Sequence, residues 1–89
     1  MEFKVEIHRN VLKFLSGLSR QEKDRVIRKL RELSKNPFPR ESLRIKGYKE
    51  KLYRIRVGDY RILYYVDENS FTIFIFKIDK RSRIYNRVE

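Results

Sequence analysis

The sequence contains no cysteine and no tryptophan, and only one histidine among its 89 residues. Without cysteine the chain has no disulfides, no thiolate ligands for zinc and no thiol nucleophile, a composition that fits a reducing interior. It also has no apolar run of transmembrane length, and its first seven residues alternate charged and apolar side chains, whereas a signal peptide has a continuous apolar stretch. We therefore expect a cytoplasmic protein that is not attached to a membrane.

Motifs of the common active sites are missing as well. The chain has no glycine-rich phosphate loop, no H-E-x-x-H sequence and no calcium-loop spacing. His8 stands alone beside Arg9 and is more typical of a surface side chain than of a catalyst. Asp59 and Asp79 lie next to turn or strand-end positions, where carboxylates commonly serve the turn. We expect no metal, no cofactor and no catalytic pair of carboxylates.

Positive charge is what the sequence has in excess. Its 23 Lys and Arg against 12 Asp and Glu give a net charge of +11, and 40% apolar with 13% aromatic residues are enough for a small core. A chain of this length forms one domain, here residues 1–89. Its strong positive potential favours a nucleic acid as the partner, an acidic protein being compatible with that. An anionic membrane is an alternative partner. The charge is alternatively explained by a heat-adapted protein with charged residues on every solvated face.

The first half of the chain reads as one strand and two helices. Apolar side chains at every second position indicate a half-buried strand, and Asn10 is a candidate N-cap for the apolar residues at helical spacing that follow it. Ser19 and Glu22 have the spacing of a capping box, which predicts the start of a second helix. The predicted elements are a strand over residues 3–7, helices over 10–18 and 20–35, and a break at Asn36-Pro37-Phe38-Pro39.

The second half changes to the period of strands. Strands are predicted around residues 43–45, 52–57, 60–66 and 71–78, with turns at Gly58-Asp59 and at residues 67–70. The last two strands are apolar on both faces, which places them at the centre of an antiparallel sheet. The order β-α-α-β-β-β-β predicts an α+β domain in which a helical hairpin packs on one face of a twisted, mainly antiparallel sheet.

Cations concentrate in this sheet half. Arg54 and Arg56 are two residues apart and share a face opposite to the apolar residues that meet the helices. The hairpin can bring Arg61 to the same face, and the end of the last strand can bring Arg81 near. Guanidinium groups suit phosphate because each offers a planar fork of donors and keeps its charge. Alternating arginines on a solvated strand face are the equally weighted alternative.

Aromatic side chains admit two interpretations. Four of them in the central strands are more typical of a core than of a platform for stacked bases, namely Tyr64, Tyr65, Phe74 and Phe76. Tyr85 follows the last strand among arginines. It is either a packed residue or a phenol in a cationic pocket, where positive charge favours the phenolate.

The run of residues 52–64, LYRIRVGDYRILY, resembles the RelE/ParE toxin superfamily, and more closely its RelE branch. The segment DKRSRIY at residues 79–85 and LRIKG at residues 43–47 resemble it too, so the resemblance covers nearly the whole chain. It implies a single RelE-like toxin domain with the fold of these microbial RNases. It also implies the toxin of a type II toxin–antitoxin pair, a metal-independent mRNA interferase that cleaves messenger RNA in the ribosomal A site and inhibits translation.

The resemblance also implies roles for individual residues. Attack of a ribose 2′-OH on the adjacent phosphate would be supported by Arg61 at the phosphorane and by Arg81, which would stabilise or protonate the leaving oxygen. The base would be either Tyr85, as phenolate, or a water molecule activated by a neighbouring cation. The implied partners are a RelB-like antitoxin, in a hetero-oligomer, and the ribosome with mRNA in its A site. The implied RNA- and phosphate-binding residues are Arg54 and Arg56, which match the family's basic pair. The concentration of cations in the sheet half adds Lys46, Lys80 and Arg83 as candidates for the same role.

Two departures from the family pattern concern this site. The basic pair is often lysine in the family and is Arg54 and Arg56 here, which favours bidentate phosphate binding over proton transfer. The spacing from Arg81 to Tyr85 is also short compared with the spacing in some RelE sequences. A ParE-like inhibitor of DNA gyrase that acts by binding, and a non-catalytic RNA-binding module, are the alternative functions.

Overall fold

The computed structural model describes residues 2–49 and 51–80, which form two helices and one five-stranded sheet. The strand order in the sheet is β1-β5-β4-β3-β2, with β1 parallel to β5 and the other pairs antiparallel. The mainly antiparallel α+β architecture expected from the sequence is confirmed. In chain order the elements are β1 (Lys4–Ile7), α1 (Arg9–Ser16), α2 (Arg20–Lys35), β2 (Leu43–Ile45), β3 (Leu52–Val57), β4 (Tyr60–Asp67) and β5 (Thr72–Lys80).

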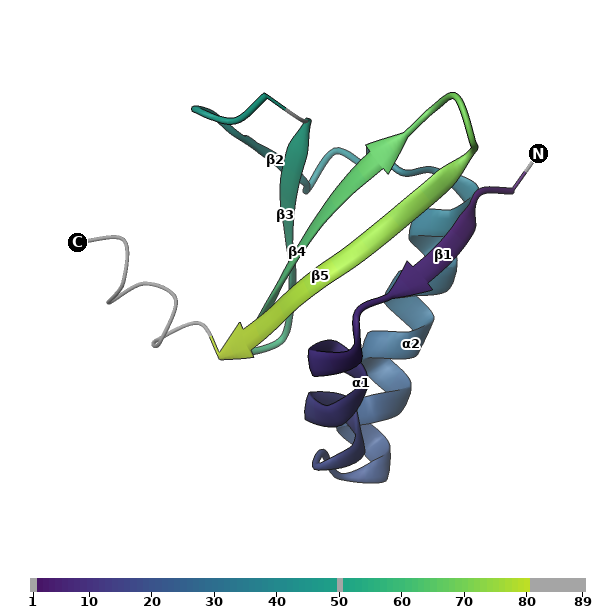
Figure 1. Cartoon of the computed structure of the whole chain (residues 1–89). Coiled ribbons are helices and arrows are strands. Elements are labelled where there is room, and N and C mark those ends of the chain that lie inside the picture. The colour runs from purple at the N-terminus through teal and green to yellow at the C-terminus, as the bar shows by residue number, and fades with distance from the viewer. Residues whose placement is uncertain (1, 50, 81–89) are drawn as a thin grey trace.

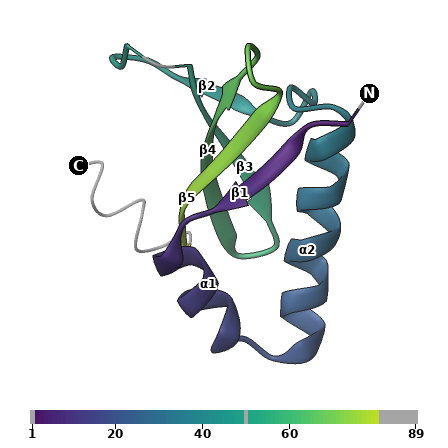
Figure 2. The same ribbon diagram turned by 45° about the vertical axis from the view of Figure 1, so that its right-hand side comes forward.

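Both helices lie on one side of the sheet and leave its other face open (Figure 1). Seen from the second direction, β1 runs alongside β5 at the edge of the sheet and leads into α1 (Figure 2). Apolar residues of α1 and α2 pack against alternate residues of β3, β4 and β5, because a strand sends successive side chains to opposite faces. The most deeply buried of these side chains are Val11, Val26, Leu33, Ile55, Ile62, Tyr64, Ile73 and Ile75.

The start of α2 agrees with the sequence in detail. Ser19 Oγ accepts a hydrogen bond from the backbone N–H of Glu22 at 3.2 Å, and the Glu22 carboxylate accepts one from the N–H of Ser19 at 3.4 Å. This is the predicted capping box. The helix ends at Lys35, and Asn36 follows in an extended conformation ahead of the first proline.

The first helix begins one residue earlier than the sequence predicts. His8, and not Asn10, is its N-cap: His8 is extended, and its Nδ1 accepts a hydrogen bond from the Asn10 backbone N–H at 3.1 Å. The imidazole nitrogen therefore takes the place of the oxygen that usually caps a helix. The helix also ends earlier, at Ser16, because Gly17 is its C-cap.

Two tyrosines of β4 connect the sheet to the ends of α2. The Tyr60 hydroxyl donates to Glu22 Oε2 at 3.0 Å, and the Tyr64 hydroxyl donates to the Pro37 carbonyl at 2.9 Å. Burial raises the pKa of Tyr64 to about 12, so this donor stays protonated at neutral pH. These hydrogen bonds fix how α2 lies across the sheet.

We expect the substitution Glu22→Gln to make the thermal midpoint of unfolding less sensitive to acidic pH. The hydrogen bond from Tyr60, and then those from Ser19, hold the pKa of Glu22 below its ordinary value of 4.5. A carboxylate of this kind stabilises the fold above its unfolded-state pKa, and the contribution is lost as the pH falls through the lower, folded-state value. Below about pH 4.5 the thermal midpoint of the unmodified protein should therefore fall more steeply than that of the variant.

Circular dichroism melts of both proteins across this acidic range measure the difference. Asp24→Asn, which changes an exposed carboxylate on the same helix, is the matched control and should follow the unmodified protein. Parallel curves for the unmodified protein and Glu22→Gln would show that the ionised carboxylate of Glu22 makes no pH-dependent contribution to stability.

Candidate nucleic-acid interface

The open face of the sheet carries the arginines that the sequence singled out. On β3, Ile55 and Val57 are buried toward the helices, so Arg54 and Arg56 project from the other face. Arg56 lies directly across from Arg61 of β4 in the antiparallel register, which puts these two side chains on the same face. The turn at Gly58 that forms the hairpin has φ +58°, a conformation that favours glycine.

These three arginines differ in exposure. Arg56 is exposed and Arg54 is half-buried, whereas Arg61 is only 4% exposed. The sequence indicated an uncovered position for Arg61, but β4 is an interior strand with neighbours on both sides. Across from Arg61 on β5 lies Asp79, which is 7% exposed and whose Oδ1 accepts a hydrogen bond from the Lys80 N–H at 2.7 Å. Arg61 is thus held in one place, and the two arginines of β3 extend toward solvent.

A cavity of about 330 Å³ opens next to these arginines. It is lined by Arg40, Glu41, Leu43, Arg54 and Arg56. Arg40 was not singled out from the sequence, because it lies in the irregular segment between α2 and β2, where no period indicates which way a side chain points. Its charge was the only signal.

The remaining predicted cations do not all join this cluster. Lys46 is exposed directly after β2, at the edge of the sheet. Lys80 lies across from Tyr60, whose ring is in the core, so Lys80 projects from the helix-covered face. Its charge there helps to lower the pKa of Glu22, after the hydrogen bonds from Tyr60 and Ser19. Lys80 therefore lies on the opposite face from Arg61. Arg81, Arg83 and Tyr85 lie outside the described residues.

The three arginines that line the cavity, Arg40, Arg54 and Arg56, take part in none of the ion pairs found among the described residues. Ion pairs among residues 2–49 and 51–80 include those that join Lys4 to Glu6, Lys29 to Glu32 and to Glu41, and Lys51 to Glu68. Within that part of the chain none of these pairs uses the three arginines that line the cavity. Planar guanidinium groups without a carboxylate partner are suited to bind a phosphodiester through paired hydrogen bonds.

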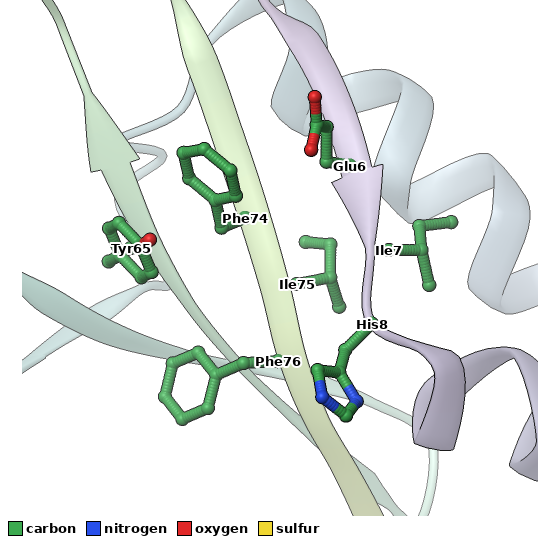
Figure 3. Close-up of a pocket in the computed structure, with 7 residues that line it drawn as sticks. All are labelled: Glu6, Ile7, His8, Tyr65, Phe74, Ile75 and Phe76. Carbon is green, nitrogen blue, oxygen red and sulfur yellow. The ribbon is translucent and has the colours of Figure 1, made fainter.

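Three aromatic side chains share the open face with the arginines. The sequence favoured a core position for four tyrosines and phenylalanines of β4 and β5, and this is correct for Tyr64, which is fully buried. Tyr65, Phe74 and Phe76 instead lie on the face away from the helices (Figure 3). The Tyr65 and Phe74 rings stack with centroids 4.7 Å apart, and they line a cavity of about 240 Å³ together with Phe76 and His8.

The described part of the chain lacks two features of other classes of protein, a membrane-spanning helix and a cluster of metal ligands. Neither helix in the described part of the chain combines the length and the apolar character needed to cross a membrane. Residues 2–49 and 51–80 bring together no group of three or more His, Asp or Glu side chains that could hold a metal ion.

The chain matches a known protein family over most of its length. The family model described as the ParE toxin of the type II toxin–antitoxin system parDE matches residues 5–85. A protein of Methanocaldococcus jannaschii named as a toxin, RelE1, is 37% identical over 87 residues, which cover 96% of this chain and 97% of the relative.

Solved structures show the same fold. The archaeal RelE–RelB complex from Pyrococcus horikoshii contains a chain that is 34% identical, with a TM-score of 0.83 over 93% of this chain and 99% of that one. A chain of the RelB–RelE complex from Methanococcus jannaschii is 26% identical, with a TM-score of 0.70 over 90% and 94%. The isolated RelE toxin of E. coli, at 19% identity, has a TM-score of 0.75 over 98% and 99%, and shares the fold.

Proposed function

Since this chain belongs to the RelE/ParE superfamily of toxins of type II toxin–antitoxin systems, and to its RelE branch, we propose that it is a ribosome-dependent endoribonuclease. It cleaves messenger RNA in the ribosomal A site and so inhibits translation in the cytoplasm. The observation that carries this proposal is the placement of Arg54, Arg56 and Arg61 on one open face of the sheet, with Arg56 directly across from Arg61.

The proposed reaction is an internal phosphoryl transfer. The ribose 2′-OH attacks the adjacent phosphate, the bond to the 5′ oxygen of the next nucleotide breaks, and the products are a 2′,3′-cyclic phosphate and a free 5′-OH. Arg61 stabilises the charge that develops on the phosphorane, a task suited to a cation held in place before the reaction begins. Arg54, Arg56 and Lys46 hold neighbouring phosphates, with Arg83 as a further contact.

Proton transfer is assigned to the residues that follow β5. Tyr85, as phenolate, takes the proton of the 2′-OH, and Arg81 stabilises the leaving 5′ oxygen, which takes up a proton from water. Positive charge around Tyr85 favours the phenolate. Lys80 is not among the proposed phosphate contacts, because it projects from the other face of the sheet.

In this proposal the ribosome supplies the alignment of the RNA substrate, which so small a domain does not provide by itself. Alignment of the attacking oxygen, the phosphorus and the leaving oxygen accounts for a large part of the acceleration of such a reaction. A toxin that enters the A site finds its substrate already extended and held. This accounts for a catalytic domain that offers little besides arginines.

A RelB-like antitoxin is the proposed protein partner. The solved structures to which this chain is similar include RelE–RelB complexes of archaea. With a net charge of +11, the chain attracts an acidic segment that covers the open face and competes with RNA. Toxin and antitoxin would then form a hetero-oligomer in which the toxin is inactive.

Primer extension on a defined messenger RNA in a reconstituted translation reaction tests the proposal. The intact protein should cut within A-site codons only when ribosomes are present, and Arg81→Ala and Tyr85→Phe should each abolish the cuts, because they remove the proposed leaving-group stabilisation and the base. Circular dichroism should show both variants folded. Full activity in both variants would overturn the assignment of these two residues, and the absence of cuts from the folded intact protein would overturn the nuclease proposal.

Gyrase inhibition is the second candidate function, because the family model that matches residues 5–85 is described as a ParE toxin. A ParE-like protein would act by binding and would need no arginine placed at a scissile phosphate. Inhibition of DNA supercoiling by purified gyrase, together with no cleavage of mRNA on ribosomes, would favour it.

A further inference from the structure

The arginine-lined cavity beside β3 joins two segments that are separate in the sequence. Arg54 and Arg56 reach it from β3, and Arg40 reaches it from the segment between α2 and β2. Its volume of about 330 Å³ is that of a site for a small ligand such as one nucleotide unit. Arg56 belongs both to this cavity and to the cross-strand pair with Arg61. A phosphate in the cavity would therefore be a neighbour of a phosphate bound at Arg61.

One acidic residue lines the same cavity. Glu41 follows Arg40 directly, and a carboxylate there would compete with phosphate for the guanidinium groups. In the structure Glu41 Oε2 is instead bound to Lys29 Nζ of α2 at 3.0 Å. Lys29 also binds Glu32 at 3.0 Å, and its side chain is only 20% exposed. The side chain of Lys29 is therefore fixed, and it holds Glu41 toward the helix.

Titration of the pair agrees with this arrangement. The hydrogen bond from Lys29 lowers the pKa of Glu41, and the hydrogen bonds to Glu41 and Glu32 raise the pKa of Lys29. Both groups are charged at neutral pH. The negative charge of Glu41 is thus compensated on the helix side, and the cavity keeps the positive charge of its arginines.

We propose that Arg40, Arg54 and Arg56 form a phosphate-binding subsite for the RNA strand, and that Lys29 is a positioning residue that keeps the Glu41 carboxylate paired with α2 and away from these arginines. The proposal rests on the RNA-directed function proposed above and extends it to two residues, Arg40 and Lys29. Arg40 contacts the phosphate that neighbours the scissile one. Lys29 touches no RNA and acts only through Glu41.

Binding of a fluorescently labelled, single-stranded 2′-O-methyl RNA of about ten nucleotides, followed by anisotropy without ribosomes, tests the subsite. The 2′-O-methyl group prevents cleavage during the measurement. Arg40→Ala should weaken binding about five-fold and should lower the slope of log K against log salt by about 0.7, the value for one lost phosphate contact on a single strand. Arg28→Ala, which removes an exposed arginine of α2, is the matched control and should change affinity less than about two-fold.

A double-mutant cycle tests the role of Lys29. Lys29→Met should weaken binding about five-fold because Glu41 is then released toward the arginines. Lys29→Arg, which can keep the ion pair, should bind like the unmodified protein. Glu41→Gln should bind more tightly, and adding Lys29→Met to Glu41→Gln should change affinity less than about two-fold. Lys23→Met controls for the loss of one charge from an exposed position of the same helix.

The outcomes separate this inference from the proposed function. If the unmodified protein binds the RNA, and Arg40→Ala and Lys29→Met behave like their controls, the subsite is wrong while the RNA-directed function stands. If Lys29→Met weakens binding equally with and without Glu41, Lys29 does not act through Glu41. No RNA binding by the folded, unmodified protein would overturn both the subsite and the RNA-directed function.

Discussion

Replacing Arg61 with glutamine is expected to slow A-site cleavage at least about 100-fold, because it removes the charge that stabilises the phosphorane. Losses of this size follow when one preorganised group is taken from an oxyanion site. Arg61 is preorganised because its side chain is only 4% exposed on an interior strand, between Arg56 on β3 and Asp79 on β5. Single-turnover cleavage of ribosome-bound mRNA, followed by primer extension, measures the effect.

Two further variants separate chemistry from binding at this place. Arg61→Lys keeps the charge but loses the planar fork, so it should retain part of the activity that Arg61→Gln loses. Arg56→Gln removes an exposed contact on the same face and should weaken binding more than it slows the bound complex. Unchanged cleavage by a folded Arg61→Gln variant would show that Arg61 does not stabilise the transition state of the reaction.

Replacing Leu33 with alanine is expected to lower the free energy of unfolding by about 2–5 kcal/mol, the range found when a buried leucine is truncated. Leu33 lies on α2, is 0% exposed and belongs to the core between the helices and the sheet. The truncation leaves a cavity that this small core can fill only by moving α2. A domain of 89 residues has a total stability of about 5–10 kcal/mol, so the variant should unfold at much lower urea concentration.

Leu12→Ala is the matched control for this prediction. The side chain of Leu12 is 53% exposed on α1, so its truncation should change the free energy of unfolding by less than about 0.5 kcal/mol. Urea unfolding followed by circular dichroism compares the two variants. Equal midpoints would contradict the packing of Leu33 between α2 and the sheet.

Local signals in the sequence were sufficient for most element boundaries. The capping box at Ser19 and Glu22, the break after Lys35 and the turn at Gly58 are set by residues within a few positions of one another, and each is found where the sequence predicts it. The prediction of Asn10 as the N-cap of α1 was wrong, because His8 and Asn10 both carry a suitable acceptor. The choice between them depends on where β1 ends, and that is fixed by its pairing with β5.

Alternation along β3 and the family resemblance were likewise sufficient to identify much of the candidate site. The two arginines of β3 share the open face because a strand has a period of two, and no other part of the chain is needed to establish this. The arrival of Arg40 beside them depends on the path between α2 and β2. The periodic pattern of apolar residues does not indicate where the side chains of an irregular segment point.

What the sequence by itself determined was therefore the elements, their order, the basic face of β3 and the family. Only the tertiary structure decided on which face of the sheet each side chain at the end of β5 lies. A bulge between β4 and β5 at Leu63 and Tyr64 shifts the register, so that Tyr64 pairs with Ile75 but Ile62 pairs with Ile78. Odd-numbered residues of β5 therefore face the helices before the bulge, and even-numbered residues face them after it. This reversal places Asp79 beside Arg61 and sends Lys80 to the helix side. The bulge is a property of the pairing of two strands, and the sequence of either strand alone does not contain it.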